Sequence, residues 1–358
     1  MSTTPRIEPL ALLAEQLETA AKLVSGADRL ASMRAQDVTL AQTPKDEVWR
    51  DGKVVLYRYR PRVEQPFPIP VLIVYAFINR YEMIDLQEDR SLVANLLDQG
   101  VDVYVVDWGR PDRGDRYVTL GDYVEWWVDG CVDAISERHH LDKINVLGIC
   151  QGGTMSLCYA ALHPERVQNL ITIVTPVDFS PHSVVNEWTR EIDADAMADS
   201  LGSIPGDLIT AGFMTRSPFE KNLRKYVDLV DLLDDERKLL AFLRMEKWIF
   251  DTPDLPGDSF RQWLKDFYQG NKLISGDVEL AGRRVDLRNI TMPVLNVYGE
   301  QDDVVPPEMA EPLGRYVGTS DYTAREFPVG HIGMYVSSKM QAQLAPMLAS
   351  WLFQRGGT

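Results

Sequence analysis

One cysteine lies in a sequence context that can turn its thiol into a nucleophile. Cys150 is the central residue of GICQGG (148–153), which follows the apolar run INVLGI (144–149) and precedes a helix-compatible segment. With serine in place of cysteine, this pattern is typical of a nucleophile elbow, a sharp strand-to-helix turn that exposes its central side chain. The flanking glycines fit, because larger side chains there would collide with the backbone. A lone G-x-C-x-G motif is weak, and buried cysteines are usually inert, but the strand-to-helix position favours a catalytic thiol.

A thiol nucleophile needs a base that promotes its thiolate, and a histidine near the C-terminus can supply one. His331 lies in GHIG after the strand-like REFPVG, and a closing helix is predicted over 337–353. Asp302 lies in GEQDDVVPP, directly after the apolar run PVLNVYG. Its neighbour Asp303 is the rival acid, and either aspartate would otherwise be a turn or capping residue. The chain order of nucleophile, acid and histidine predicts a triad of Cys150, Asp302 and His331.

The other cysteines and histidines have structural explanations. Cys131 falls on the apolar stripe of a predicted helix, and Cys158 lies two turns into the helix after Cys150, so both are expected in the core. The other histidines lie at predicted helix ends, where exposed imidazoles are favourable, or outside any motif: His139, His140, His163 and His182.

Charge that develops on a substrate carbonyl requires preorganised hydrogen-bond donors. One donor is expected to be the backbone N–H of Gln151, the residue that follows the nucleophile. The second should come from the loop after the strand at 70–77, where the sequence reads FINR. We predict the backbone N–H of Ile78 as that donor.

The elements that would hold these residues alternate between strand and helix patterns. Short apolar runs suit strands buried on both faces of a parallel sheet, and helical spacing separates them over 85–99 and over 119–138, the latter behind a Thr119 cap. The strand-like runs are 52–59, 70–77, 101–108, 144–149, 169–175 and 293–299. This alternation predicts an α/β fold of the α/β-hydrolase type, a mostly parallel sheet flanked by helices.

Three regions are predicted along the chain. Residues 1–40 form a helical segment with amphipathic spacing over 8–34, and residues 41–180 and 289–358 form the catalytic core. From 181 to 288 the strand pattern stops and charge-rich, helix-like sequence replaces it, which indicates an inserted helical cap.

Composition excludes several classes of protein. Lys and Arg total 37 against 53 Asp and Glu among 358 residues, and the net charge of −16 argues against a nucleic-acid partner. The N-terminus lacks a signal-peptide pattern, and no stretch approaches the ~18 apolar residues of a membrane span, so a cytoplasmic protein is expected. Three cysteines argue against a disulfide framework. No metal or cofactor is expected.

Several segments together resemble polyhydroxyalkanoate (PHA) synthases, from about residue 40 to the C-terminus. They are FINRYEMIDLQEDRSLV, VYVVDWGRPD, KINVLGICQGGT, TPVDF, VYGEQDDVVPP and VGHIGMYV. The length and the GICQGG spelling are similar to the short catalytic subunit of the class III enzymes. The resemblance implies that a 3-hydroxyacyl-CoA, with 3-hydroxybutyryl-CoA the expected substrate, acylates Cys150 and that a polyester chain grows. It implies that His331 activates Cys150, whereas Asp302 either orients His331 or activates the substrate hydroxyl.

The same resemblance implies the partners. Class III subunits work with a companion, PhaE, whereas the class IV enzymes of nearly equal length use PhaR, which the motif spelling makes less favoured. A homodimer, with the cap contributing to dimerisation, and association with storage granules are also expected. Coenzyme A enters as part of the substrate, and Arg80 and Arg90 are candidate contacts for its phosphates only because they are cations near the expected cavity mouth.

Two other function classes remain open. A thioesterase or PHA depolymerase would share the fold and the residue order but admit water to the acyl-enzyme. A granule-associated binding protein with an inactive hydrolase fold is less favoured, because Cys150, Asp302 and His331 are all present.

Overall fold

A single mixed sheet carries the site. The computed structural model describes residues 22–24, 26, 29–215 and 224–356, so most of the helical segment predicted over 8–34 lies outside the described residues. Among the described residues, eight strands form this sheet in the order β1-β2-β6-β3-β7-β8-β13-β14. The strands are β1 (Lys45–Asp51), β2 (Val54–Tyr59), β3 (Val71–Val74), β6 (Val103–Asp107), β7 (Ile144–Ile149), β8 (Val167–Ile173), β13 (Val294–Gly299) and β14 (Tyr322–Phe327).

The strand directions bring three loops to one edge of the sheet. β1, β2 and β6 pair antiparallel, and every pair from β6 to β14 is parallel. In the shared register Gly148 of β7 lies beside Val74 of β3 and Thr172 of β8. The carboxyl ends of these strands therefore meet, as the predicted fold requires.

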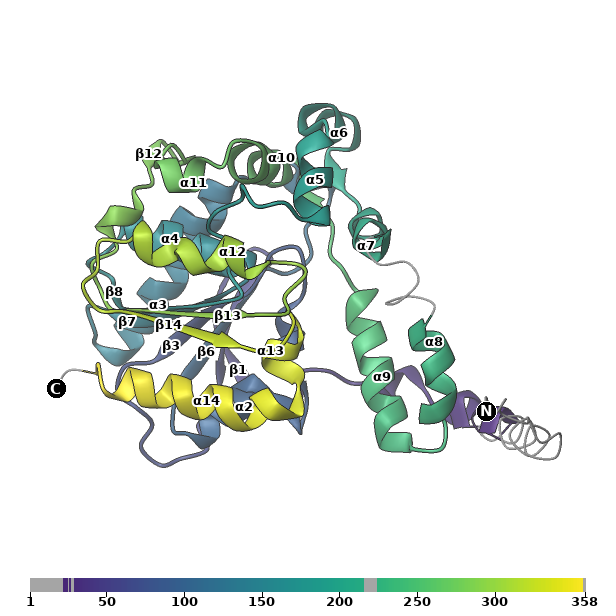
Figure 1. Ribbon diagram of the computed structural model, residues 1–358. Coiled ribbons are helices and arrows are strands. Elements are labelled where there is room, and N and C mark those ends of the chain that lie inside the picture. The colour runs from purple at the N-terminus through teal and green to yellow at the C-terminus, as the bar shows by residue number, and fades with distance from the viewer. Residues whose placement is uncertain (1–21, 25, 27–28, 216–223, 357–358) are drawn as a thin grey trace, which may run out of the picture.

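Helices cover both faces of the sheet (Figure 1). On one face α2 (Leu92–Asp98) packs against α14 (Ser338–Phe353), the predicted closing helix. On the other lie α3 (Asp129–His139) and α4 (Gln151–Leu162). Alternate residues of one strand enter different cores, with Leu72 and Val74 on the α3–α4 side and Val71 and Ile73 on the α2–α14 side. The α/β-hydrolase architecture predicted from the alternating pattern is confirmed.

The helix predicted over 85–99 is wrong in its first half. β4 (Asp85–Gln87) and β5 (Arg90–Ser91) form a short hairpin there, and α2 begins only at Leu92. The buried Asp85 carboxylate accepts hydrogen bonds from the hydroxyls of Thr43 (2.7 Å) and Ser91 (2.6 Å). Ser91 in turn caps α2 by accepting from the Ala94 N–H. These bonds hold the residues before Leu92 in a hairpin, so the helix starts only after Ser91.

The predicted cap of the helix at 119–138 is confirmed. The Thr119 hydroxyl accepts from the Asp122 N–H (3.2 Å), and the Asp122 carboxylate accepts from the Thr119 N–H (2.7 Å). The helix first adopts π geometry in η4 (Asp122–Val128) and continues as α3. The edge strand β1 carries mostly charged residues, and sequence periodicity did not identify it.

Most of the secondary structure between β8 and β13 is helical. α5 and α6 lie above the sheet near α10, whereas α8 and α9 extend to the side of the core, next to the described N-terminal residues (Figure 1). The helices include α5 (Val184–Glu191), α6 (Ala194–Leu201), α7 (Gly206–Thr215), α8 (Arg224–Asp228), α9 (Glu236–Ile249), α10 (Gly257–Gln262), η7 (Trp263–Gln269) and α11 (Lys272–Ser275). No helix in the described ranges is long and apolar enough to cross a membrane.

Candidate active site

Cys150 occupies a strained turn between β7 and α4. Its backbone angles are φ 55° and ψ −125°, a region that side-chain-bearing residues rarely adopt. The surrounding glycines are needed for close approach. A Cβ on Gly148 would meet the backbone of Gly153, one on Gly152 would meet the carbonyl oxygen of Val74, and one on Gly153 would meet the hydroxyl of a neighbouring threonine. The structure therefore supports the steric reason that the sequence suggested for these glycines.

His331 and Asp302 form a buried pair. The Nδ1 of His331 lies 2.7 Å from Oδ2 of Asp302, and the side chain of each is less than a tenth exposed. The other carboxylate oxygen accepts from the backbone N–H groups of Val304 (2.9 Å) and Val305 (2.8 Å), which fixes its orientation. Asp303, the rival acid, is exposed. Of the two aspartates, the structure places Asp302 against the histidine.

The imidazole of His331 also contacts the sulfur of Cys150. Burial by itself lowers the pKa of His331, but the Asp302 carboxylate and a hydrogen-bonded Cys150 thiolate outweigh burial and raise that pKa to about 10. A histidine in contact with the sulfur is the partner that a nucleophilic cysteine requires. The three residues predicted from chain order thus lie together, in an arrangement able to attack a carbonyl carbon.

The two predicted oxyanion donors are Gln151, which follows the nucleophile in the chain, and Ile78, which lines a cavity together with Cys150. Gln151 begins α4, and the first N–H groups of a helix have no partner within the helix. The Ile78 N–H lies in the loop after β3 and donates to Oε1 of the Gln151 side chain at 3.3 Å. The structure therefore brings Ile78 and Gln151 together, in a contact that sequence reasoning did not foresee.

A cavity of about 400 Å³ opens onto Cys150 and His331. Sequence reasoning missed two tyrosines in it, Tyr75 just after β3 and Tyr335 four residues after His331, whose hydroxyls lie 3.3 Å apart. Burial raises the pKa of both tyrosines, so both remain neutral donors. Their only sequence signal is their position beside the motifs. The residues between β8 and β13 contribute Thr210, Phe213, Met214, Lys225, Phe242, Met245, Glu246, Trp248, Ile249 and Thr252 to the lining.

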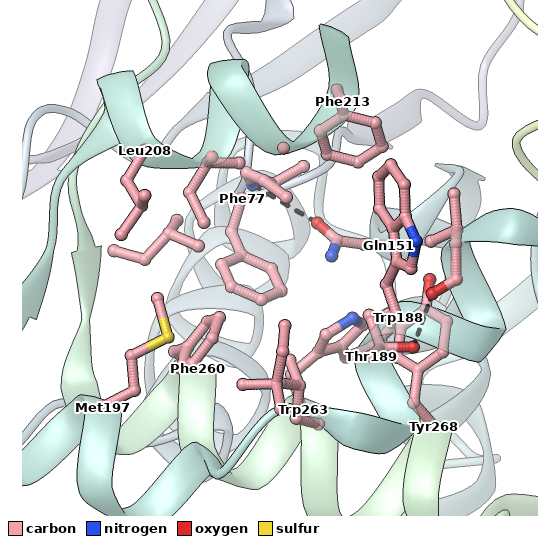
Figure 2. Close-up of a pocket in the computed structure, with 17 residues that line it drawn as sticks. Phe77, Gln151, Trp188, Thr189, Met197, Leu208, Phe213, Phe260, Trp263 and Tyr268 are labelled. Carbon is pink, nitrogen blue, oxygen red and sulfur yellow. Dashed lines mark hydrogen bonds between the residues drawn. The ribbon is translucent and has the colours of Figure 1, made fainter. Parts of the chain in front are cut away.

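A second, more apolar cavity of about 240 Å³ adjoins Gln151 (Figure 2). Phe77 and Ile78 line it from the core, and aromatic side chains such as Trp188 and Trp263 line it from the helices above. The Gln151 side chain lines this cavity, and its amide oxygen accepts from the Ile78 N–H (Figure 2). Ile78 lines both cavities, so the loop after β3 borders each of them.

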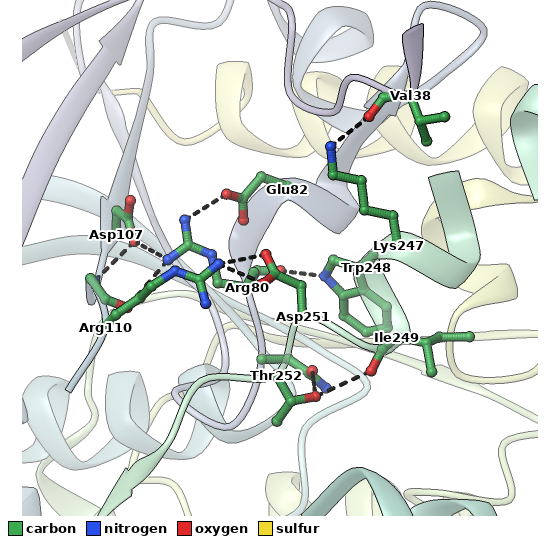
Figure 3. A network of polar contacts seen from close by, with 12 residues as sticks. Val38, Arg80, Glu82, Asp107, Arg110, Lys247, Trp248, Ile249, Asp251 and Thr252 are labelled. Atoms are coloured by element: carbon green, nitrogen blue, oxygen red, sulfur yellow. Dashed lines mark hydrogen bonds and ion pairs between the residues drawn. The ribbon is translucent and has the colours of Figure 1, made fainter. Parts of the chain in front are cut away.

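Arg80 does not face the cavity as a free cation (Figure 3). Its guanidinium lies 2.6 Å from the Glu82 carboxylate and 3.4 Å from Asp107, and its backbone carbonyl accepts from the Trp248 indole at 2.7 Å. Arg90 belongs to β5 and is not part of the lining of either cavity in the described part of the chain. The suggestion that these arginines contact coenzyme A therefore receives no support. Lys225 lines the Cys150 cavity and pairs with Glu246 at 2.8 Å.

The remaining cysteines are buried as predicted, and burial raises the pKa of Cys158 to about 12. The expectation of exposed helix-end histidines is wrong for two of them. His139 hydrogen-bonds with the Tyr104 hydroxyl at 2.7 Å, and His163 contacts the Glu125 carboxylate at 3.0 Å, both side chains being less than a fifth exposed. Both imidazoles are held in partly buried positions by side chains distant in sequence, Tyr104 and Glu125. No group of three or more His, Cys, Asp or Glu side chains in the described ranges is arranged to hold a metal ion.

Comparison with known proteins identifies the family. Residues 69–338 match the family model of the alpha/beta hydrolase fold, and residues 8–96 match that of the poly-beta-hydroxybutyrate polymerase (PhaC) N-terminus. The chain is 51% identical to the poly(3-hydroxyalkanoate) polymerase subunit PhaC of Synechocystis sp., over 96% of this chain and 93% of that one. The chain belongs to the PhaC family. The PhaC subunit of Allochromatium vinosum is 48% identical, over 98% of this chain and 99% of that one.

Solved structures show the same fold at low identity. A soluble variant of monoglyceride lipase from Saccharomyces cerevisiae aligns with a TM-score of 0.55 at 14% identity, covering 91% of this chain and 99% of that one. A thermophilic esterase from Thermogutta terrifontis aligns with a TM-score of 0.52 at 18% identity, covering 88% and 100%. These likenesses support the α/β-hydrolase fold of this PhaC family member and carry no argument about its reaction. The family resemblance drawn from the motifs is confirmed.

Proposed function

We propose that this PhaC family member is the catalytic subunit of a poly(3-hydroxyalkanoate) polymerase that uses 3-hydroxyacyl-CoA, with 3-hydroxybutyryl-CoA as the first substrate to test. The observation that carries the proposal is the identity of 51% with a polymerase subunit over nearly the full length of both chains. The arrangement of Cys150, His331 and Asp302 supplies the chemistry that such a transfer needs.

Acylation begins with the Cys150 thiolate. The sulfur attacks the thioester carbonyl carbon, and the N–H groups of Gln151 and Ile78 stabilise the oxyanion that forms. The carbon–sulfur bond to coenzyme A then breaks, and the coenzyme A thiolate takes the proton held by His331. The acyl group stays activated, because one thioester has replaced another. A cysteine therefore suits a transferase whose second acceptor is an alcohol.

Elongation transfers the acyl group to a 3-hydroxyl. The hydroxyl oxygen attacks the Cys150 thioester, its proton passes to a neighbouring base, an ester bond forms, and the Cys150 thiolate leaves. Asp302 either orients His331 as that base or activates the hydroxyl itself. Its carboxylate contacts His331 in the resting site, which favours the orienting role at least for acylation.

The partners follow from family resemblance. We propose that the chain is a class III subunit that acts with PhaE, forms a homodimer and acts in the cytoplasm at the surface of the growing granule. The match with the Allochromatium subunit covers 98% of this chain and 99% of that one, which supports the likeness to that subunit. Co-expression with PhaE should raise polymer formation more than co-expression with PhaR. The opposite result would contradict the class III assignment.

The decisive experiment follows the acyl group. Purified protein given 3-hydroxybutyryl-CoA should gain a 3-hydroxybutyryl adduct in intact-mass analysis, release coenzyme A and form insoluble polyester. Cys150→Ala should show no adduct and no polymer, and Cys158→Ala, which changes a buried thiol, serves as the matched control.

Two results would contradict the proposal. Stoichiometric soluble 3-hydroxybutyrate without polymer, even with the companion present, would indicate the thioesterase or depolymerase alternative. An absence of any Cys150-dependent adduct would indicate a binding protein.

A further inference from the structure

We propose that the side chain of Gln151 is a gate that closes the oxyanion hole of the resting site and must swing away before a thioester can be attacked. The inference rests on the proposed function, because it concerns the N–H that would stabilise the oxyanion of the acylation step. Gln151 thereby has two opposed roles. Its backbone N–H is one oxyanion donor, and its side chain withholds the other.

The donor in question is already bound. The Ile78 N–H donates to Oε1 of Gln151 at 3.3 Å (Figure 2). Oε1 is a carbonyl-type oxygen, the same kind of acceptor as the oxygen of a thioester. The amide of Gln151 would therefore compete with a substrate carbonyl for the Ile78 N–H.

The loop does not depend on this bond for its position. The Trp108 indole donates to the carbonyl oxygen of Tyr75 at 3.0 Å, and the Trp248 indole donates to that of Arg80 at 2.7 Å (Figure 3). These bonds fix the loop on both sides of Ile78, and both are shorter than the Gln151 contact at 3.3 Å. The Gln151 contact is thus the most readily exchanged of the three, as expected of a gate rather than a support.

The displaced amide has space available. Gln151 lines the cavity of about 240 Å³ that lies on the far side of Ile78 from the one lined by Cys150. Rotation of the side chain within this cavity, away from Ile78, would release the Ile78 N–H. The resting site is therefore closed by a side chain and opened by a rotation, so substrate binding and opening are coupled.

The size of the effect follows from competition. A tethered acceptor reduces the population of the open site, and substrate affinity falls by the same fraction. One neutral hydrogen bond of this kind corresponds to about a two- to tenfold change in the open fraction. Removal of the acceptor should lower KM for the thioester by that factor.

Gln151→Met tests the gate, because methionine keeps the length of the side chain and lacks the carbonyl oxygen. The matched control is Gln262→Met. It removes a similar bond from the Leu120 N–H to Oε1 of Gln262 (3.0 Å), just before η4, together with the bond from Nε2 of Gln262 to the Glu279 carbonyl oxygen (3.2 Å). Single-turnover acylation by 3-hydroxybutyryl-CoA is followed by intact mass in both variants. Alkylation of Cys150 by iodoacetamide is measured in parallel, since that displacement forms no oxyanion.

The expected result is specific to the thioester. Gln151→Met should be acylated about two- to tenfold faster than the unchanged chain at low substrate concentration. Its alkylation by iodoacetamide should stay within about twofold of that of the unchanged chain. Both rates of Gln262→Met should also stay within about twofold of those of the unchanged chain. Gln151→Glu, which keeps an acceptor and adds charge beside the developing oxyanion, should be acylated at least about tenfold more slowly.

Slower acylation of a folded Gln151→Met would overturn the gate and make the side chain a support for the loop. Equal acceleration of alkylation would overturn it in favour of simple access to Cys150. If the unchanged chain is never acylated, the proposed function fails instead, which is a distinguishable outcome.

Discussion

At the scale of single residues, the environment of Cys150 decides its reactivity. Cys131 and Cys158 have the same thiol but lie among apolar side chains, where burial raises their pKa. Cys150 instead contacts an imidazole whose other nitrogen is held by Asp302 at 2.7 Å. One thiol of the three is thus placed where a cation can stabilise its ionised form.

The protonation of His331 is a direct prediction of this arrangement. Its pKa is raised to about 10 by Asp302 and Cys150 against the effect of burial, so the imidazole should stay protonated from about pH 6 to about pH 9. In Asp302→Asn one of the charges that raise the pKa is lost, so the midpoint should move down. Nitrogen-15 NMR of labelled histidine, assigned with His331→Gln, measures both midpoints. An unchanged midpoint in Asp302→Asn would contradict the role given to the carboxylate.

At the scale of elements, the turn between β7 and α4 brings backbone segments into very close contact. The helix approaches β3 so closely that a Cβ on Gly152 would meet the carbonyl oxygen of Val74. Backbone atoms cannot move aside without breaking the pairing of β3 with β7. The position of Cys150 therefore depends on a residue two positions away that has no chemistry of its own.

Gly152→Ala should destabilise the fold by about 3 kcal/mol, because the new methyl group overlaps backbone rather than a flexible side chain. Gly212→Ala is the control, since Gly212 lies inside α7 and a Cβ there meets nothing within 4 Å. It should stabilise the chain by about 0.5–1 kcal/mol through helix propensity and a less flexible unfolded state. Urea unfolding measures both changes, and equal midpoints for the two variants would contradict the steric argument.

At the scale of the whole molecule, the net charge of −16 affects the rate at which a charged substrate associates with the protein. Coenzyme A is an anion, so the summed field of the protein repels it at long range. The effect should weaken once the screening length falls to about 8–10 Å near physiological ionic strength. Association with an acyl-CoA is thus expected to become faster as the salt concentration rises.

We expect kcat/KM for 3-hydroxybutyryl-CoA to rise about two- to fivefold as the ionic strength increases from about 0.02 to about 0.2 M. The neutral N-acetylcysteamine thioester of the same acid is the control, and its kcat/KM should stay constant. Initial rates of thiol release measure both. A fall in kcat/KM for the coenzyme A substrate would indicate a local basic site that outweighs the net charge.

The sequence by itself determined the fold class and the three residues brought together at the nucleophile. Buried parallel strands require continuous apolar runs, and the close approach of α4 requires glycine at 148, 152 and 153. Both requirements can be recognised from the types of the residues alone. The order of Cys150, Asp302 and His331 along the chain follows from the order of the strands that hold them. Local pattern and covalent order were sufficient for these conclusions.

Only the tertiary structure decided the contacts between segments distant in sequence. The Asp85 carboxylate binds the Ser91 hydroxyl, so the predicted helix begins later than expected. Arg80 pairs with Glu82, and His163 contacts Glu125. The bond between Ile78 and Gln151 joins residues 73 positions apart and depends on how the loop after β3 packs against the start of α4. A hydrogen bond forms only when donor and acceptor lie about 3 Å apart in a suitable orientation. The order of residue types along the chain does not specify which distant groups meet that condition.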